Sequence, residues 1–257
     1  MTKDVTKILF IIPPHLSFND FLNPLPNAKQ IKKKDGKYYG SLVTDMPLGA
    51  LSLSAYINAY CKTKVDTHLI DFNIELNEVD TYDYPNPQAY YNQYLSEELD
   101  FEPDIIALSA LFSSSYYNIV DIANCCRQIF PNSLLLAGGS VPTNMYEFLL
   151  KATTVFDGLC YGEGERPLTQ LIDTEDRKAF IDSHPSWITQ KKVDNKHLFS
   201  HDFIENLDEI PFYDYKLCKM EKYGANPAIM AYGSIKDKID NFHVMTSRGC
   251  PFRCTFC

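Results

Sequence analysis

Five short apolar runs occur in the first two thirds of the chain, and segments with helical periodicity separate them. The apolar runs are Ile8–Ile12, Val65–Phe72, Asp104–Leu111, Ser133–Ala137 and Phe156–Tyr161. They lack the polar alternation of half-exposed strands, which is typical of parallel strands buried on both faces. The helical segments are Pro47–Tyr60, Asn118–Phe130, Met145–Lys151 and Pro167–Asp173. This order predicts a doubly wound, Rossmann-like (flavodoxin-like) α/β sheet with right-handed crossovers.

The chain is expected to divide into three segments. Residues 1–175 contain the predicted strands and helices and form the Rossmann-like domain. Residues 176–240 are polar and interrupted by prolines and glycines, which indicates a linker with short elements, and residues 241–257 begin a further unit. The Tyr-rich stretch Thr81–Tyr94 predicts a helix or a long surface loop. The stretch Asn206–Phe212 predicts a short helix or turn that docks on a domain face.

The charge balance and the apolar runs exclude several classes of protein. There are 33 Asp+Glu against 24 Lys+Arg, a net charge of −9. Nucleic acids and anionic membranes select clustered positive charge, so neither is expected as the main partner. The apolar run after Lys7 stops at Pro13, which is too early for a signal sequence. The longest uncharged stretch contains Pro and Gly, so it is not expected to form a membrane helix. We therefore expect a soluble, cytoplasmic protein, in which thiols stay reduced.

Small or polar residues follow four of the five predicted strands. In doubly wound folds, ligands bind at the carboxyl ends of the strands. Glycine lets the backbone approach a ligand closely, and serine supplies a hydroxyl without bulk. Gly and Ser are also common in βα loops, so it is the occurrence of four such loops at one edge that indicates a site. The candidate contacts are Pro13, Pro14, Leu111, Ser113, Ser114, Ser115, Gly138, Gly139, Ser140, Gly162, Glu163 and Gly164.

The loop after the first strand argues against a nucleotide ligand. It contains Pro13, Pro14 and His15 where a dinucleotide site has G-x-G-x-x-G. Asp71, at the end of the second strand, could imitate a ribose-binding carboxylate, but the glycine turn is missing. The sequence also has no G-x-x-x-x-G-K-[ST] segment, which excludes a P-loop.

Three of the eight cysteines, Cys250, Cys254 and Cys257, lie in the last eight residues, after a predicted strand at Phe242–Thr246. Their spacing places three thiolates around one centre, which suits a cluster of several irons or an incomplete tetrahedral metal site. A structural zinc site would need a fourth ligand. On a 4Fe-4S cluster one iron would stay open to a substrate, and Phe256 would shield the loop from water. The other cysteines share no ligand spacing and are expected to pack in the core.

The run Thr-Ser-Arg-Gly-Cys-Pro-Phe-Arg-Cys-Thr-Phe-Cys that ends the sequence resembles the cluster motif Cys-x3-Cys-x-aromatic-Cys of the radical S-adenosylmethionine (SAM) superfamily. The preceding domain resembles the cobalamin (vitamin B12)-binding domain that precedes the radical SAM barrel in one large subgroup. The resemblance implies that cobalamin contacts the matching loops, including Leu48 and Gly49. These loops are Pro47-Leu48-Gly49, Ser109-Ala110-Leu111-Phe112-Ser113-Ser114-Ser115-Tyr116, Gly138-Gly139 and Gly162-Glu163-Gly164-Glu165.

The resemblance also implies a mechanism for the intact enzyme. Cys250, Cys254 and Cys257 would hold a 4Fe-4S cluster whose open iron chelates SAM. Reductive cleavage of SAM would give a 5′-deoxyadenosyl radical that abstracts a substrate hydrogen, and cobalamin would deliver a methyl group in methyltransferase members. A reductant such as flavodoxin or ferredoxin is implied as a partner. The substrate, a small molecule or a peptide, cannot be deduced.

The sequence departs from the family pattern in two ways. Many cobalamin domains carry Asp-x-His-x-x-Gly after the first strand, with the His on the cobalt. This chain lacks that motif, so no histidine is expected on the cobalt. The radical SAM barrel would begin at about Phe242, yet the sequence stops at Cys257. We expect a truncated fragment that does not cleave SAM by itself.

Two other functions remain open at this point. The Rossmann-like domain could be vestigial and free of cobalamin, or the chain could be a flavodoxin-like binding module with a zinc-binding C-terminus. Several charged residues also have two interpretations. Glu163 and Glu165 suit an acid/base pair or, as expected, a loop-shaping role, and Arg248 and Arg253 suit contacts with anionic groups or, as expected, exposure to solvent. The lysines between residues 29 and 37 suit a phosphate-binding loop or, as expected, a solvated one.

Overall fold

The computed structural model describes residues 5–223, 243–250, 252 and 254–255. Its main sheet has six strands in the order β4-β1-β5-β6-β7-β8. Every pairing from β4 to β7 is parallel, and β8 pairs with β7 antiparallel. The strands are β1 (Val5–Ile12), β4 (Lys64–Asp71), β5 (Ile105–Ser109), β6 (Leu134–Gly138), β7 (Gly158–Cys160) and β8 (Trp187–Ile188).

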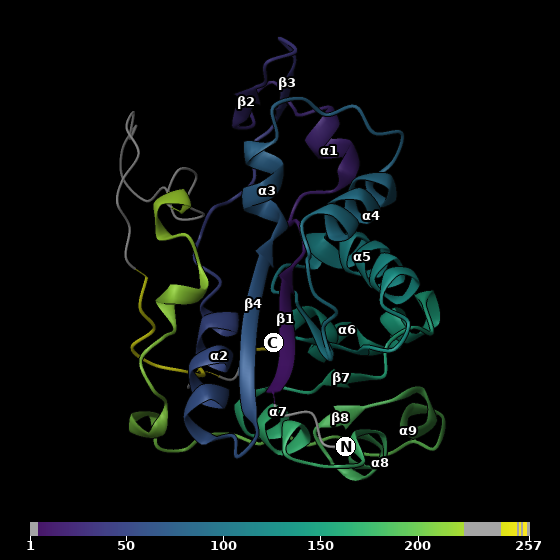
Figure 1. The fold of residues 1–257 in the computed structure, drawn as a ribbon, viewed down its shortest axis with the longest axis vertical. Helices are drawn as coiled ribbons and strands as arrows, with labels where there is room; N and C mark the ends of the chain where they lie inside the picture. The colour runs from purple at the N-terminus through teal and green to yellow at the C-terminus, as the bar shows by residue number, and fades with distance from the viewer. Residues whose placement is uncertain (1–4, 224–242, 251, 253, 256–257) are drawn as a thin grey trace.

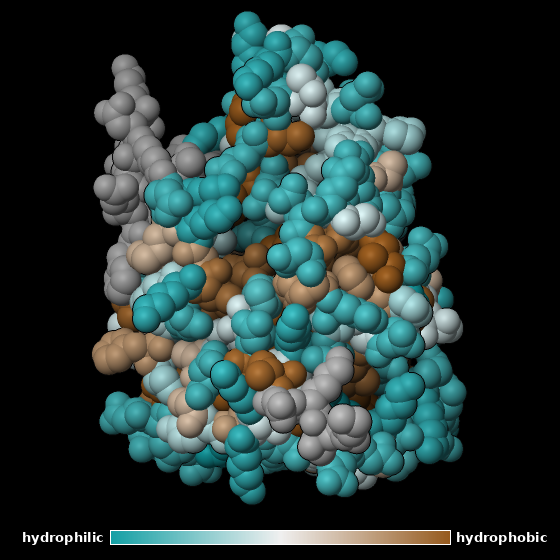
Figure 2. Space-filling model, viewed as in Figure 1, coloured by the Kyte–Doolittle hydropathy of each residue, from teal (hydrophilic) through white to brown (hydrophobic). Residues whose placement is uncertain are grey.

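Helices cover both faces of the sheet (Figure 1). Residues of α2, α7 and α8 pack in one core, and residues of α4, α5 and α6 pack in the other. The helices are α2 (Leu48–Tyr60), α4 (Pro87–Glu97), α5 (Tyr116–Ile129), α6 (Ser140–Ala152), α7 (Glu165–Ile172) and α8 (Arg177–Ser183). This arrangement confirms the predicted doubly wound α/β fold. The β1–β4 edge of the sheet lies in front in Figure 1, and Figure 2 shows apolar residues gathered across the middle of that face.

Strand β1 explains why an apolar run without alternation predicts a strand. Ile8 and Phe10 point into the core with α2 and α7, whereas Leu9 and Ile11 point into the core with α4 and α5. All four side chains are fully buried. Burying each stabilises the fold by roughly 1.5–3 kcal/mol relative to exposure, so both faces of the strand must be apolar.

A hairpin of β2 (Gln30–Lys32) and β3 (Tyr38–Gly40) lies outside the main sheet, next to α1 (Phe18–Leu22). The prediction that this lysine loop is solvated is wrong for Lys33. Its ammonium is buried and donates to the carbonyls of Leu76 and Asn77, in the last turns of α3 (Phe72–Glu78), at 2.9 and 2.6 Å. Burial lowers the pKa of Lys33 to about 8.

The chain continues beyond residue 175 into the same sheet. Trp187 and Ile188 of β8 are buried, and α9 (Gln190–Asp194) follows them. The domain boundary at 175 remains a prediction. The 3-10 turns η2 (Leu207–Glu209), η3 (Tyr215–Leu217) and η4 (Met220–Lys222) come next, and the Tyr60 hydroxyl of α2 donates to the Glu209 carbonyl at 2.7 Å. A short element therefore docks where the stretch Asn206–Phe212 predicts one.

The described residues 243–246 of the strand predicted over Phe242–Thr246 do not form a strand. Phe242 lies outside the described residues, and residues 243–248 belong to neither a helix nor a strand. A strand needs a hydrogen-bonded neighbour, and neither sheet of the described residues includes this segment. In the same described parts of the chain, no helix has the length and apolar character needed to cross a membrane.

Candidate functional site

The carboxyl ends of five parallel strands define the edge where a ligand is expected. Strand β1 lies between β4 and β5, so the crossover from β1 to β4 runs in one direction and the crossover from β4 to β5 returns past β1. The order therefore reverses between β1 and β5. In doubly wound sheets such a switch point opens a crevice between the two loops that leave it. Here these are the loops that follow Ile12 and Ser109.

The loop after β5 exposes apolar side chains at this edge of the sheet. Leu111 is 65% exposed and Phe112 is 45% exposed. The 3-10 turn η1 (Ser113–Ser115) follows, with Ser113 and Ser114 exposed and Ser115 buried. Exposed apolar groups beside exposed hydroxyls suit a ligand with a flat apolar body and a polar periphery.

The loop after β6 packs tightly against the loop after β5. Gly139 has a φ of +95°, and a Cβ at this position would lie 2.7 Å from the Ala110 carbonyl oxygen. The Ala110 N–H donates to the Gly138 carbonyl, and the Val141 N–H donates to the Ala110 carbonyl, both at 3.0 Å. Gly139 is thus required by backbone conformation and by the approach of a second loop. Ser140, exposed, begins α6.

The loop after β7 is covered by a residue from beyond 175. Gly162 has a φ of +87°, and a Cβ there would lie 2.0 Å from Nδ1 of His201. The His201 ring also stacks on Tyr161, with ring centroids 4.4 Å apart. His201 thus leaves no room for a side chain at Gly162, and a side chain at Gly164 would meet Leu53 of α2 at 3.1 Å.

His15 lies in the loop after β1, three residues beyond the end of the strand. The His15 Nε2 accepts the Val43 N–H at 3.2 Å, which leaves the proton on Nδ1, 2.7 Å from the Asn73 amide oxygen. Burial lowers the pKa of His15, which favours this neutral form. Both ring nitrogens are occupied by protein groups, so His15 is not available to a metal. Pro13 and Pro14 are buried, and their carbonyls accept side-chain amide hydrogens.

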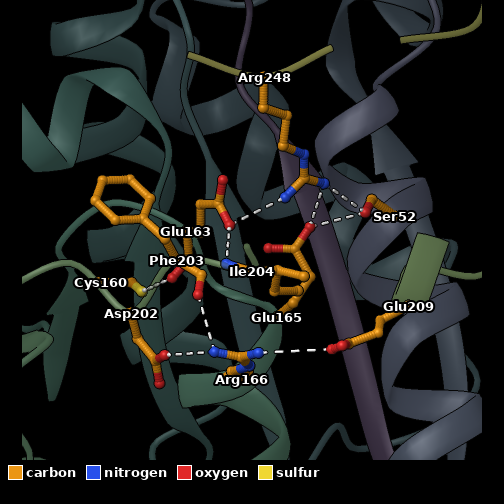
Figure 3. Close-up of polar contacts among 10 residues, drawn as sticks. All are labelled: Ser52, Cys160, Glu163, Glu165, Arg166, Asp202, Phe203, Ile204, Glu209 and Arg248. Carbon is orange, nitrogen blue, oxygen red and sulfur yellow. Dashed lines mark hydrogen bonds and ion pairs between the residues drawn. The ribbon is translucent and has the colours of Figure 1, made fainter. Parts of the chain in front are cut away.

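Glu163 and Glu165 bind Arg248 (Figure 3), which lies two residues before Cys250 in the sequence. The Arg248 guanidinium lies 3.3 Å from Glu163 Oε2 and donates to Glu165 Oε1 at 2.6 Å. The same guanidinium nitrogen donates to the Ser52 hydroxyl of α2 at 3.0 Å, and Ser52 donates to Glu165 at 2.8 Å. We call these four residues the Arg248 cluster.

The Arg248 cluster is well shielded from water. The side chain of Glu165 is 5% exposed, and those of Arg248 and Glu163 are each 19% exposed. Partial burial disfavours the charged guanidinium, but the hydrogen bond and the charge of Glu165 outweigh it and raise the pKa of Arg248. The expectation that Arg248 is a solvated surface arginine is therefore wrong, because it contacts two anionic groups and these glutamates hold it in place.

The segment 243–248, which ends at Arg248, has a second attachment at its start, at His243. The His243 Nδ1 accepts the Met46 N–H at 3.3 Å, and the His243 carbonyl accepts the Tyr215 hydroxyl at 2.7 Å. Residues 243–248 are thus held at both ends against the loop before α2, the η3 turn and the loop after β7. Cys250 and Cys254 are exposed and form no disulfide.

The predicted metal site is only partly within the described residues, since Cys257 and Phe256 lie outside them, as does Arg253. No group of three or more His, Cys, Asp or Glu side chains that could hold a metal occurs in the ranges that the structure describes. The triad of thiolates therefore stays a prediction. Leu48 and Gly49 begin α2, and Gly49 is exposed. A Cβ on Gly49 would meet the Ser109 hydroxyl at an ordinary contact distance of 3.9 Å.

The sequence did not indicate the partners of Arg248 and His243. Ser52 is one of several small residues in α2, and Tyr215 is one of 17 tyrosines. No motif marks either residue. The only available signal was the position of Arg248, two residues before Cys250, together with a pair of acidic residues in the loop after β7.

The comparisons with known proteins now define the class of domain. Residues 46–172 match the family model of the B12-binding domain. This range runs from the loop before α2 to the end of α7 and includes the loops after β5, β6 and β7. Residues 46–172 of this chain are therefore similar to the B12-binding domain.

Three curated relatives extend the likeness. An uncharacterized methyltransferase of Pyrococcus horikoshii is 32% identical over 98% of this chain and 45% of its own length. An anaerobic magnesium-protoporphyrin IX monomethyl ester cyclase of Rubrivivax gelatinosus is 26% identical over 79% of this chain and 34% of its own length. The cobalamin-dependent radical SAM methyltransferase TokK of Streptomyces tokunonensis is 26% identical over 61% of this chain and 22% of its own length. The chain thus spans less than half the length of these relatives.

The residues at the carboxyl edge fit a cobalamin. Its flat macrocycle is apolar at the faces and carries amide groups at its edge, which matches exposed Leu111 and Phe112 beside exposed Ser113 and Ser114. A Cβ on Gly138 would meet the Cβ of Cys160 at an ordinary contact distance of 3.7 Å. His15 has no free ring nitrogen for the cobalt.

Proposed function

We propose that this chain is the N-terminal, cobalamin-binding part of a cobalamin-dependent radical SAM enzyme that performs methyl transfer or related radical chemistry. The observation that carries the proposal is the attachment of the segment before Cys250 to the carboxyl edge of the B12-binding domain through Glu163 and Glu165. This attachment supports the proposal, because Arg248 lies two residues before Cys250. The names of the relatives, one of them a cobalamin-dependent radical SAM methyltransferase, support it.

In this proposal each group of residues has a distinct role. Leu111 and Phe112 form an apolar surface for the corrin, and Ser113 and Ser114 hydrogen-bond to its periphery. Cys250, Cys254 and Cys257 hold a 4Fe-4S cluster. The bound cofactors supply reductive cleavage of SAM and methyl-group chemistry, whereas the protein orients them and excludes water.

Anaerobic reconstitution of the complete protein with iron and sulfide tests the cluster. The proposal predicts the broad visible absorption of an iron–sulfur cluster and an EPR signal after reduction. Replacing Cys254 with Ala should abolish both. A matched replacement of Cys218, which lies outside the motif, should change neither. A product that contains zinc and no cluster absorption would favour the flavodoxin-like module with a zinc-binding C-terminus and contradict the proposal.

Titration with hydroxocobalamin tests the domain separately. Saturable binding at micromolar concentrations is expected, with weaker binding after Leu111→Asp or Phe112→Asp. Protein that forms the cluster but does not bind cobalamin would favour the vestigial-domain alternative. The two measurements therefore distinguish all three functions that the sequence left open.

A further inference from the structure

The Arg248 cluster joins two parts of the chain that the proposed function assigns to different cofactors. Glu163 and Glu165 belong to the loop between β7 and α7 and to the start of α7, within the range of the B12-binding domain. Arg248 lies two residues before Cys250, so its Cα is within about 7 Å of the Cys250 Cα along the chain. The contact is multidentate, because one guanidinium spans two carboxylates and a hydroxyl.

The burial of Glu165 makes this contact more than a surface ion pair. A carboxylate that is 5% exposed needs a charged partner, and Arg248 is its only cation within ion-pair distance among the described residues. Ser52 fixes the geometry by donating to Glu165 and accepting from Arg248. Glu163 is held in turn by the Ile204 N–H, which donates to its Oε2 at 3.1 Å. Each carboxylate is thus oriented independently of Arg248.

We propose that Arg248 is a positioning residue that holds the cysteine loop against the β7–α7 loop and so sets the separation between the cluster and the cobalamin. The inference rests on the proposed function for its two cofactors, but the contact itself does not. A lysine could not replace Arg248 fully, because one ammonium cannot bridge Glu163, Glu165 and Ser52 in the same planar geometry.

The separation can be measured by pulsed EPR on the complete protein that carries a reduced cluster and cobalamin in its paramagnetic Co(II) form. The wild type should give one narrow distance distribution. Arg248→Gln should broaden it with iron and cobalt contents unchanged, and Arg248→Lys should give an intermediate width. Arg166→Gln is the matched control, because Arg166 is next to Glu165 in α7 but binds Asp202 and Glu209 instead of the Arg248 cluster (Figure 3). An unchanged distribution in Arg248→Gln would overturn the positioning role while leaving the proposed function intact.

A second measurement tests the contact without any cofactor. In the cofactor-free complete protein, trypsin can cleave after Arg248 only when the side chain leaves its carboxylates. Glu165→Gln should speed this cleavage by about tenfold or more, because the acceptor of the Arg248 guanidinium loses its negative charge and the contact weakens. Glu209→Gln, which removes a carboxylate from the Arg166 pair, should leave it unchanged. Equal cleavage rates in the wild type and Glu165→Gln would contradict the contact. If the wild type gave EPR signals from neither centre, the proposed function would be refuted, whereas the Arg248 contact would not be affected.

Discussion

Replacing Gly139 with alanine tests whether the loops after β5 and β6 form one rigid edge. A φ of +95° with a ψ of −171° lies in a region that is essentially restricted to glycine, and a residue with a Cβ would be disfavoured there by roughly 1–3 kcal/mol. The new Cβ would also lie 2.7 Å from the Ala110 oxygen, so the two loops must separate. Separation weakens the hydrogen bonds from Ala110 to Gly138 and from Val141 to Ala110, each worth about 1 kcal/mol. The free energy of unfolding should therefore fall by about 3–5 kcal/mol.

Alanine substitutions at two other glycines separate the cost of the backbone conformation from the cost of the clash between the loops. The free energy of unfolding of each variant is measured in urea. Gly36 has a φ of +82° but no atom within 4 Å of a Cβ, so Gly36→Ala should lose only the conformational contribution of roughly 1–2 kcal/mol. At Gly138 the nearest atom to a Cβ is 3.7 Å away and φ is not positive, so Gly138→Ala should lose less than Gly139→Ala. Gly139→Ala should also weaken hydroxocobalamin binding, and Gly36→Ala should not. If Gly139→Ala were no more destabilising than Gly36→Ala, the close packing of the two loops would be refuted.

Three further predictions concern single side chains. Phe112→Asp should weaken hydroxocobalamin binding about tenfold or more, because an exposed apolar contact becomes charged. The control Leu198→Asp, at a residue 94% exposed, should leave the titration unchanged. Burial raises the pKa of Asp71 to about 6, so this group stabilises the fold at low pH and the contribution is lost as the pH rises from about 4 through 6. When the pH is lowered from 7 to 4, the free energy of unfolding of the wild type should rise by up to about 3 kcal/mol relative to that of Asp71→Asn. An equal pH dependence of the two free energies would contradict this. Cys254→Ala should lower bound iron after reconstitution, with Cys218→Ala as the control, and equal iron contents would count against Cys254 as a ligand.

The parallel sheet could be predicted from the sequence because burial on both faces leaves a local pattern. All five strands and four helices predicted within residues 1–175 are present in the structure, with bounds that differ by a few residues, whereas the strand predicted at Phe242–Thr246 is not seen in its described residues. The shorter elements, such as α8 and β8, could not be predicted. Their stability comes from tertiary contacts, as in the burial of Trp187 against the sheet, which leave no periodic signal in a few residues.

The candidate site was predictable in its position and less so in its contacts. Strand ends could be located, and the small residues Gly138 and Gly139 stood out beside them. The sequence could not reveal that Gly139 and Gly162 are required by neighbouring Ala110 and His201. It also could not pair Arg248 with carboxylates more than 80 residues away, since such contacts depend on how the chain returns to the sheet.

The metal content of the complete protein, purified anaerobically after growth with iron and cobalamin, tests the central claim most directly. We expect about four iron atoms and one cobalt atom for each chain. We also expect that Cys254→Ala lowers the iron and leaves the cobalt in place. Zinc in place of iron, with no cobalt bound, would contradict the claim.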